Sequence, residues 1–146
     1  MEGFILKGEQ GYLQLHLDEV YGFPEQTSHF GGYDAEGTLE IKSNNYFVRG
    51  KLWFTTGEVC SFYEQLGRAY DLFSGEATFS SSEVNLEFKI TFDSRGHAVF
   101  KGYFKELHHL DNELKFEIES DQSYFESTLA DLKKFVQKYG GLKGVK

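Results

Sequence analysis

Cysteine, proline and long apolar runs are scarce in this sequence. The 146 residues contain one cysteine, Cys60, which excludes an internal disulfide and any zinc site built from several cysteines. The uninterrupted apolar runs are only a few residues long, too short to span a membrane. No basic segment followed by an apolar run opens the chain, so we expect no signal peptide. These absences favour a soluble protein of the reducing cytoplasm.

The charge of the chain is distributed unevenly. All 23 Asp and Glu residues lie before Lys133, whereas five of the 15 Lys and Arg residues follow Leu132. The first 132 residues therefore carry ten basic and 23 acidic side chains, a formal balance of −13. Such a body repels nucleic acid and attracts cationic partners, so direct binding of RNA or DNA is disfavoured. The acidity can also serve solubility alone, and this interpretation stays open.

Aromatic residues are plentiful, at 17% of the chain, which is too rich for a disordered protein. The length suffices for one domain with a sizeable core, and no Pro/Gly/Ser-rich linker divides it. We therefore expect a single domain over residues 1–146. Its core spans about 3–140, and a Lys-rich C-terminal tail at 141–146 is expected to fray.

The apolar pattern predicts the fold class. Apolar and polar residues alternate, as in half-buried strands, in segments at 13–17, 39–41, 46–54, 84–92 and 114–118. The apolar run at 4–6 is expected to be a partner strand of 13–17, and 97–106 the return strand of the hairpin that follows 84–92. Two stretches, 59–73 and 125–139, instead repeat at helical spacing. This order of strands, helix, strands and helix predicts an α+β domain of antiparallel hairpins with two packed helices. Each half ends in a strand that feeds a helix, although no convincing residue-level repeat accompanies this symmetry.

Local signals mark the helix ends. Thr55–Glu58 and Ser123–Glu126 have the Ser/Thr-x-x-Glu form of a capping box, in which each side chain satisfies an amide of the first turn. Asp121 is an alternative cap for the second helix. Gly75 and Gly140 suit the two helix exits, because glycine readily adopts the left-handed conformation found there.

One segment, Tyr21–Gly37, matches neither period. It holds four aromatic residues, four glycines and the only proline. Loops of this length are uncommon in compact domains and are often functional. Its aromatic residues can plug the core beneath the sheet, or they can contact a partner, and both interpretations stay open.

Catalytic signals are weak. His108 and His109 are adjacent, so on a strand they point to opposite faces and do not share a metal easily. Cys60 has no neighbour that lowers its pKa, which favours a structural thiol. Carboxylate pairs are abundant, but catalysis needs contrasting environments across a cleft, which a sequence does not supply. We expect no catalytic residues, no metal and no cofactor.

Four segments carry a family resemblance: Gly50–Glu58 with Phe62-Tyr63 beyond it, Gly75–Phe79, Ser82–Phe88 and Ser120–Tyr124. This pattern resembles small bacterial WapI-like immunity proteins, which are antidotes to polymorphic, contact-dependent toxins. The resemblance spans the chain from about Leu13 to Tyr139. Its motifs are structural, so it fixes no inhibitory residue. It implies a non-catalytic protein whose partner is a cognate toxin with a basic, nuclease-like domain.

An acidic protein with aromatic anchors suits such a partner, because it can cover the cationic surface that holds the nuclease's substrate. We expect the contact in the long segment and on the strand that precedes the second helix. The candidate partner-binding residues are Phe30, Tyr33, Asp34, Glu36, Glu117, Glu119 and Asp121.

Two other functions remain possible on the sequence. A small-molecule-binding or regulatory domain would need a deep pocket lined by aromatic side chains. An enzyme would need a cleft with several titratable groups of strongly shifted pKa.

Overall fold

The computed structural model describes residues 2–145; Met1 and Lys146, both within the predicted domain, lie outside the described residues. The first half contains β1 (Gly3–Lys7), β2 (Gly11–Val20), β3 (Asp34–Ser43), β4 (Tyr46–Thr55) and α1 (Thr56–Leu72). The second contains β5 (Gly75–Ser80), β6 (Leu86–Phe92), β7 (His97–Phe104), β8 (Leu114–Asp121), the 3₁₀ turn η1 (Gln122–Tyr124) and α2 (Phe125–Tyr139). The predicted α+β class and element order are confirmed.

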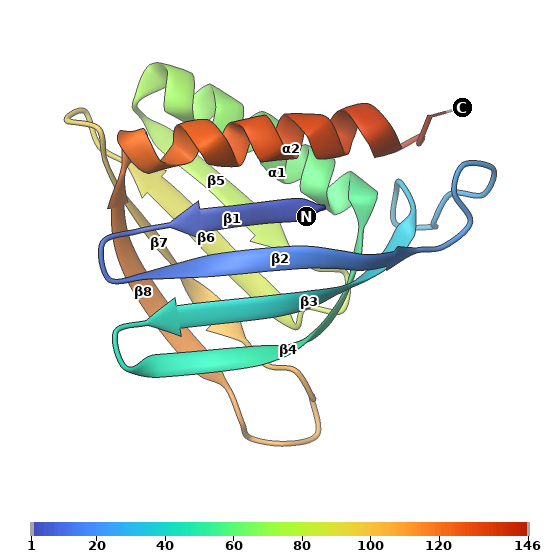
Figure 1. Ribbon diagram of the computed structural model, residues 1–146, viewed down its shortest axis with the longest axis horizontal. Helices are drawn as coiled ribbons and strands as arrows, with labels where there is room; N and C mark the ends of the chain where they lie inside the picture. Colours follow the sequence, from blue (N-terminus) through green and yellow to red (C-terminus); the bar gives the residue numbers. More distant parts are fainter. Residues whose placement is uncertain (1, 146) are drawn as a thin grey trace.

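Each half has the same plan. Strands β1 to β4 form one antiparallel sheet in sequence order, hereafter sheet A, and β5 to β8 form a second, sheet B. A helix follows the last strand of each sheet. Figure 1 shows the two sheets facing each other, with both helices lying across one side of the pair. The symmetry of the halves is therefore structural, although the residues themselves do not repeat.

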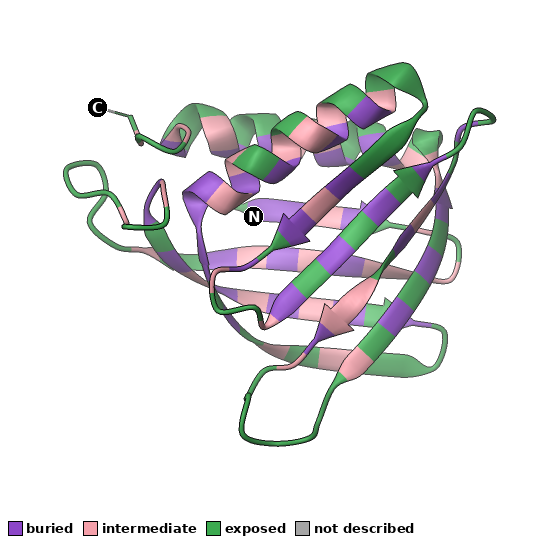
Figure 2. Cartoon of the chain, turned by 180° about the vertical axis from the view of Figure 1, so that it is seen from behind, coloured by how far each residue is buried: buried purple, intermediate pink, exposed green. Residues whose placement is uncertain are grey.

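The core lies between the two sheets and under the helices. Along β6, Leu86, Phe88, Ile90 and Phe92 are buried while the residues between them are exposed, which is the alternation expected for one buried face. Figure 2 shows the same alternation along the neighbouring strands. Phe62 of α1 lies edge-on against Phe88, with ring centroids 5.3 Å apart, and so joins the first helix to sheet B.

The first helix begins as its sequence predicts. The side chain of Thr55 accepts a hydrogen bond from the Glu58 amide, and the Glu58 carboxylate accepts one from the Thr55 amide. The helix ends at Phe73, whose backbone is left-handed, with a φ of 47°. Gly75, the predicted exit residue, instead opens strand β5, which the sequence pattern did not reveal. Val84, predicted in a strand, lies in the turn before β6 with a φ of 57°.

The second helix begins differently from the prediction. The Ser123–Glu126 capping box does not form, because residues 122–124 belong to the 3₁₀ turn. Asp121 caps that turn by accepting a hydrogen bond from the Ser123 amide, and Tyr124 precedes α2 without a side-chain cap. The exit at Gly140 is confirmed, since its amide donates to the Val136 carbonyl at 2.7 Å.

Candidate partner-binding surface

The long irregular segment is shorter than the sequence pattern indicated. Strand β2 runs to Val20 and β3 begins at Asp34, so the connection covers residues 21–33. Residues 34–37 are part of β3, where Ala35 and Gly37 are buried beside their strand partners. The connection lies at the same end of the molecule as the end of α2 and the residues that follow it (Figure 1).

Tyr33 is a core residue and not a surface anchor. Its side chain is 0% exposed. Its hydroxyl donates to the Pro24 carbonyl at 2.9 Å and accepts from the Val145 amide at 3.0 Å. Its own amide donates to the Thr56 hydroxyl at 2.8 Å. The Tyr33 ring therefore plugs the core, which is one of the two interpretations of the segment, and its side chain is not exposed to a partner in this structure.

The C-terminal tail holds this connection in place. The Gly32 amide donates to the Leu142 carbonyl at 2.8 Å. Gly31 and Gly32 have φ values of 98° and 72°, which favour glycine, and a Cβ on Gly31 would meet the Leu142 side chain at 2.6 Å. Residues 141–145 thus pack on the connection, contrary to the expectation of a frayed tail.

Phe30, Asp34 and Glu36 remain accessible. Phe30 is 61% exposed on the connection, Asp34 is exposed at the start of β3, and Glu36 is partly exposed on the outer face of sheet A. Glu36 lies opposite Glu19 of β2 and Trp53 of β4. These three predicted residues therefore border one end of sheet A.

An aromatic stack that was not among the predicted site residues lies at the same place. The rings of Tyr21 and Trp53 stack with centroids 5.6 Å apart, and the two side chains are 37% and 48% exposed. The Tyr21 hydroxyl donates to Glu19 at 2.9 Å, and the Tyr21 amide donates to the Asp34 carbonyl at 2.8 Å. The sequence feature that could have indicated this stack is Trp53 itself, a large aromatic residue on the same face of β4 as Arg49 and Lys51. We call the five residues that meet here the aromatic–acidic corner: Glu19, Tyr21, Asp34, Glu36 and Trp53.

The electrostatics of the corner are anionic. The Glu19 carboxylate raises the pKa of Tyr21, first by accepting its hydrogen bond and also by its charge, with Glu36 adding to the charge effect. Lys51, two residues before Trp53 on β4, is paired with Asp18, since its ammonium lies 3.0 Å from that carboxylate. The corner therefore presents two stacked rings within a field that favours a positive group.

The other predicted acids lie far from this corner. Glu117, Glu119 and Asp121 occupy β8, and the Glu117 carbonyl accepts a hydrogen bond from Ser43 at the far end of β3. Ser43 lies nine positions along the extended strand from Asp34, a span of about 30 Å. The Glu117 carboxylate forms an ion pair with Lys101, and the Asp121 carboxylate accepts a hydrogen bond from the Ser123 amide. The predicted residues thus form two groups, one beside the start of β3 and one on β8 of sheet B, near the end of β3.

The model of the immunity protein WapI-like family matches residues 4–140. The chain belongs to this family. The match covers nearly all of both sheets and both helices, so family membership applies to the whole fold described above. A search of curated proteins finds no match for this WapI-like chain.

The contacts of this family member's possible metal ligands and reactive side chains bear on whether it has catalytic or metal chemistry. Within residues 2–145, no group of three or more His, Cys, Asp and Glu side chains is placed to hold a metal ion. His108 is bonded to the Glu83 carbonyl at 2.8 Å. Burial raises the pKa of the Cys60 thiol, which disfavours the nucleophilic thiolate. Burial also raises the pKa of Glu58 to about 7, but that carboxyl is engaged in the cap of α1.

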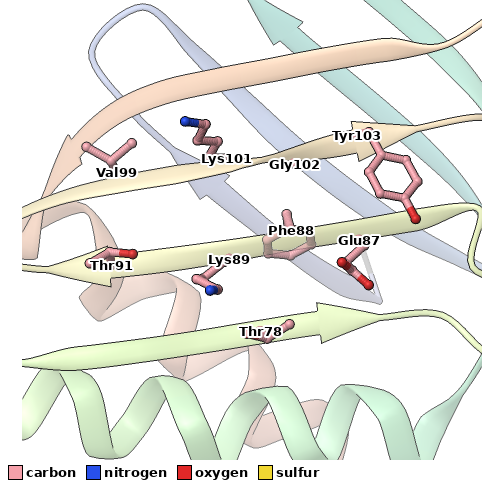
Figure 3. Close-up of a pocket in the computed structure, with 9 residues that line it drawn as sticks. All are labelled: Thr78, Glu87, Phe88, Lys89, Thr91, Val99, Lys101, Gly102 and Tyr103. Carbon is pink, nitrogen blue, oxygen red and sulfur yellow. The ribbon is translucent and has the colours of Figure 1, made fainter.

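A hollow on the outer face of sheet B does not resemble an enclosed ligand pocket. Figure 3 shows its lining from three neighbouring strands, including Lys89, Lys101 and Tyr103. The hollow opens to solvent, and apart from Tyr103 its only ring is that of Phe88, which is buried on the core side. A small-molecule-binding function would need a deeper aromatic-lined pocket. Among the described residues, no helix is both long and apolar enough to cross a membrane.

Proposed function

We propose that this chain is a non-catalytic immunity protein that binds a cognate toxin and neutralises it, and that the toxin acts through a basic nuclease domain. The observation that carries the proposal is the family match over residues 4–140. The formal balance of −13 over the first 132 residues supports the cationic nature of the partner. The protein acts in the cytoplasm, blocks the toxin by contact, and binds no nucleic acid itself.

The contact surface that we propose is the aromatic–acidic corner, together with Phe30 on the adjoining connection. Trp and Tyr are the residue types that most often dominate the binding energy of protein interfaces. Trp53 and Tyr21 are stacked on each other, so their rings are held in place before binding and lose less conformational freedom. Glu19, Asp34 and Glu36 surround the rings with negative charge. A Lys or Arg of the toxin fits there by pairing with a carboxylate and lying against a ring.

The charge of the body also bears on speed. Opposite charges on two proteins accelerate their encounter, and the acceleration falls with ionic strength. An antidote benefits from a fast encounter, because a catalytic toxin does damage for as long as it is free. We therefore expect association with the toxin to slow markedly as salt is raised.

The proposal is tested with the gene beside this one. We expect that gene to encode a long chain that ends in a small basic domain. The purified domain, catalytically inactivated, is mixed with this protein, and complex formation is measured by size-exclusion chromatography and calorimetry at low and high salt. A 1:1 complex that weakens with salt supports the proposal. Absence of a complex at both salt concentrations contradicts it. Protection of cells that express the active domain is the matching assay in vivo.

A further inference from the structure

Three of the four sheet edges are covered by the rest of the chain. Helix α2 lies along β1, where the Thr128 hydroxyl donates to the Ile5 carbonyl at 2.6 Å. Helix α1 lies along β5, where the Gln65 carboxamide bonds both backbone groups of Thr78. These contacts occupy strand groups that would otherwise pair with another chain.

The third edge, β8, is covered by the hairpin between β1 and β2. The Gln10 carboxamide donates to the Glu117 carbonyl at 2.9 Å and accepts from the Glu119 amide at 3.1 Å. The Glu9 amide adds a bond to the Glu119 carbonyl at 2.8 Å. Sheet B is therefore closed at both edges, and sheet A is closed at β1.

The fourth edge, β4, is long and regular. Its ten residues pair with β3 in one unbroken register, without a bulge. In an antiparallel pair, alternate residues direct their amides and carbonyls away from the partner strand. The Lys51 and Thr55 amides point away in this manner, because they donate to the carboxylates of Glu106 at 2.7 Å and Glu58 at 2.8 Å.

The same alternation places three more backbone groups on this edge. Phe47, Arg49 and Trp53 have the same parity as Lys51 and Thr55, so their amides and carbonyls also point away from β3. Phe47 is 57% exposed and Trp53 is 48% exposed, so two aromatic side chains flank this row of polar groups. Beside Phe47 lies a hollow bordered by Glu106 and Glu113, which leaves room along the first half of the edge.

We propose that β4 is the strand to which the partner adds, so that an extended segment of the basic toxin continues sheet A. This inference rests on the proposed function for the identity of the partner. Main-chain hydrogen bonds to the outward groups of Phe47, Arg49 and Trp53 supply affinity and register, and the Trp53 and Phe47 side chains supply contact area on one face. Trp53 belongs to both the edge and the aromatic–acidic corner, so the added strand lies directly beside the corner.

A basic partner suits this edge better than a second copy of the chain. In a symmetric antiparallel pair centred on Gly50, Arg49 of one copy would lie opposite Lys51 of the other, and like charges in that position are destabilising. Each copy also carries a net charge of −8. A basic partner does not meet the second obstacle, and it avoids the first when neutral residues of its strand lie opposite Arg49 and Lys51. Its basic residues pass the Glu106 carboxylate and lie within the negative field of Glu36, one strand further in on β3.

The closing experiment is amide hydrogen exchange with and without the inactivated toxin domain, resolved residue by residue. In the free protein we expect fast exchange at Phe47, Arg49 and Trp53, and slow exchange at Val48 and Leu52, which face β3. In the complex, exchange at the three odd-numbered residues slows by at least about tenfold, while the even-numbered residues of the same strand serve as internal controls. Unchanged exchange at Phe47, Arg49 and Trp53 in a saturated complex overturns the inference and leaves the proposed function intact. Absence of any complex overturns both.

A matched pair of variants adds a second measurement. Arg49→Pro removes an amide that points away from β3 and leaves the hydrogen bonds between β3 and β4 in place. Edge strands tolerate proline at such outward-facing positions. Arg49→Ala removes the same side chain and keeps the amide. We expect Arg49→Pro to bind the toxin domain about tenfold more weakly than Arg49→Ala, the effect of one lost hydrogen bond. Equal affinities of the two folded variants contradict the inference. If Arg49→Pro does not fold, the hydrogen-exchange experiment described above is the deciding test.

Discussion

The carboxamide of Gln65 pairs with the peptide backbone of Thr78 as another strand would. Its Nε2 donates to the Thr78 carbonyl at 3.2 Å, and its Oε1 accepts from the Thr78 amide at 3.0 Å. Gln65 lies on α1 and Thr78 on β5, so one side chain fastens the first helix to the edge of sheet B. Gln10 makes the same kind of pair at the opposite edge of that sheet.

Replacing Gln65 with glutamate tests this fastening. The new carboxylate would have no donor for the Thr78 carbonyl and would place a negative charge against it, so Gln65→Glu should lower the free energy of unfolding by about 1–3 kcal/mol. Urea denaturation measures the change. Glu64→Gln, at the neighbouring exposed position of α1, is the control, and its effect should stay within about 0.5 kcal/mol. A Gln65→Glu protein as stable as the parent would show that the pair contributes nothing.

The sequence predicted those elements whose evidence is local. Alternation located β2, β6 and β8, and the Thr55–Glu58 box fixed the start of α1, because each depends on residues that are neighbours along the chain. Strand β5 was not predicted. Only Ala77 and Phe79 are buried among its six residues, and so short an alternation directly after a helix does not identify a strand.

The candidate surface was harder to predict, because it depends on contacts between distant segments. The burial of Tyr33 requires Pro24 and Val145, and the latter lies 112 residues away. The separation of Asp34 from Glu119 depends on which ends of β3 and β8 meet. The stack of Tyr21 on Trp53 arises because β2 and β4 flank β3. Neither charge nor periodicity encodes these relations.

Removing the hydroxyl of Tyr33 should loosen the C-terminal tail. Tyr33→Phe keeps the ring in the core but leaves the Pro24 carbonyl and the Val145 amide without their partner. We expect a loss of about 1–3 kcal/mol in the free energy of unfolding and faster amide exchange at Val145. Tyr21→Phe is the matched control, because the Tyr21 hydroxyl bonds an exposed carboxylate at the surface. Comparable losses in the two variants would contradict the structural role of Tyr33.

The raised pKa of Glu58 predicts a pH dependence of stability. Burial raises this pKa from 4.5 to about 7, so between these values the folded protein binds more protons than the unfolded chain. The contribution of Glu58 to stability is therefore greatest below pH 4.5 and is lost as the pH rises to 7 and above. Glu58→Gln removes the titration and still offers an acceptor to the Thr55 amide.

We therefore expect the stability of Glu58→Gln relative to the parent to increase between about pH 5 and pH 7.5, as measured by urea denaturation at each pH. The comparison with the parent cancels the carboxyls of lowered pKa, such as Asp18, which both proteins share. A constant difference across this range would mean that the Glu58 carboxyl is ionised normally.

The aromatic stack should dominate binding of the toxin domain. Trp53→Ala removes an exposed ring that stacks on Tyr21 and leaves every buried side chain of the core unchanged. We therefore expect the variant to keep the fold. We expect at least about a tenfold loss of affinity in calorimetry, as for an interface hot spot. Leu72→Ala, at an exposed apolar residue on the last turn of α1, is the control and should bind as the parent does. Unchanged binding by Trp53→Ala would exclude the corner as the contact.

Two charge reversals decide which of the two groups of predicted acids meets the toxin. Glu36→Lys and Glu119→Lys alter the net charge equally, so they weaken long-range attraction to a similar degree. They differ in place, because Glu36 adjoins Trp53 whereas Glu119 lies on β8 near Gln10. If the aromatic–acidic corner is the contact, Glu36→Lys should lose at least about tenfold more affinity than Glu119→Lys, chiefly through faster dissociation. The reverse order would place the contact on β8, which holds three of the five predicted acids.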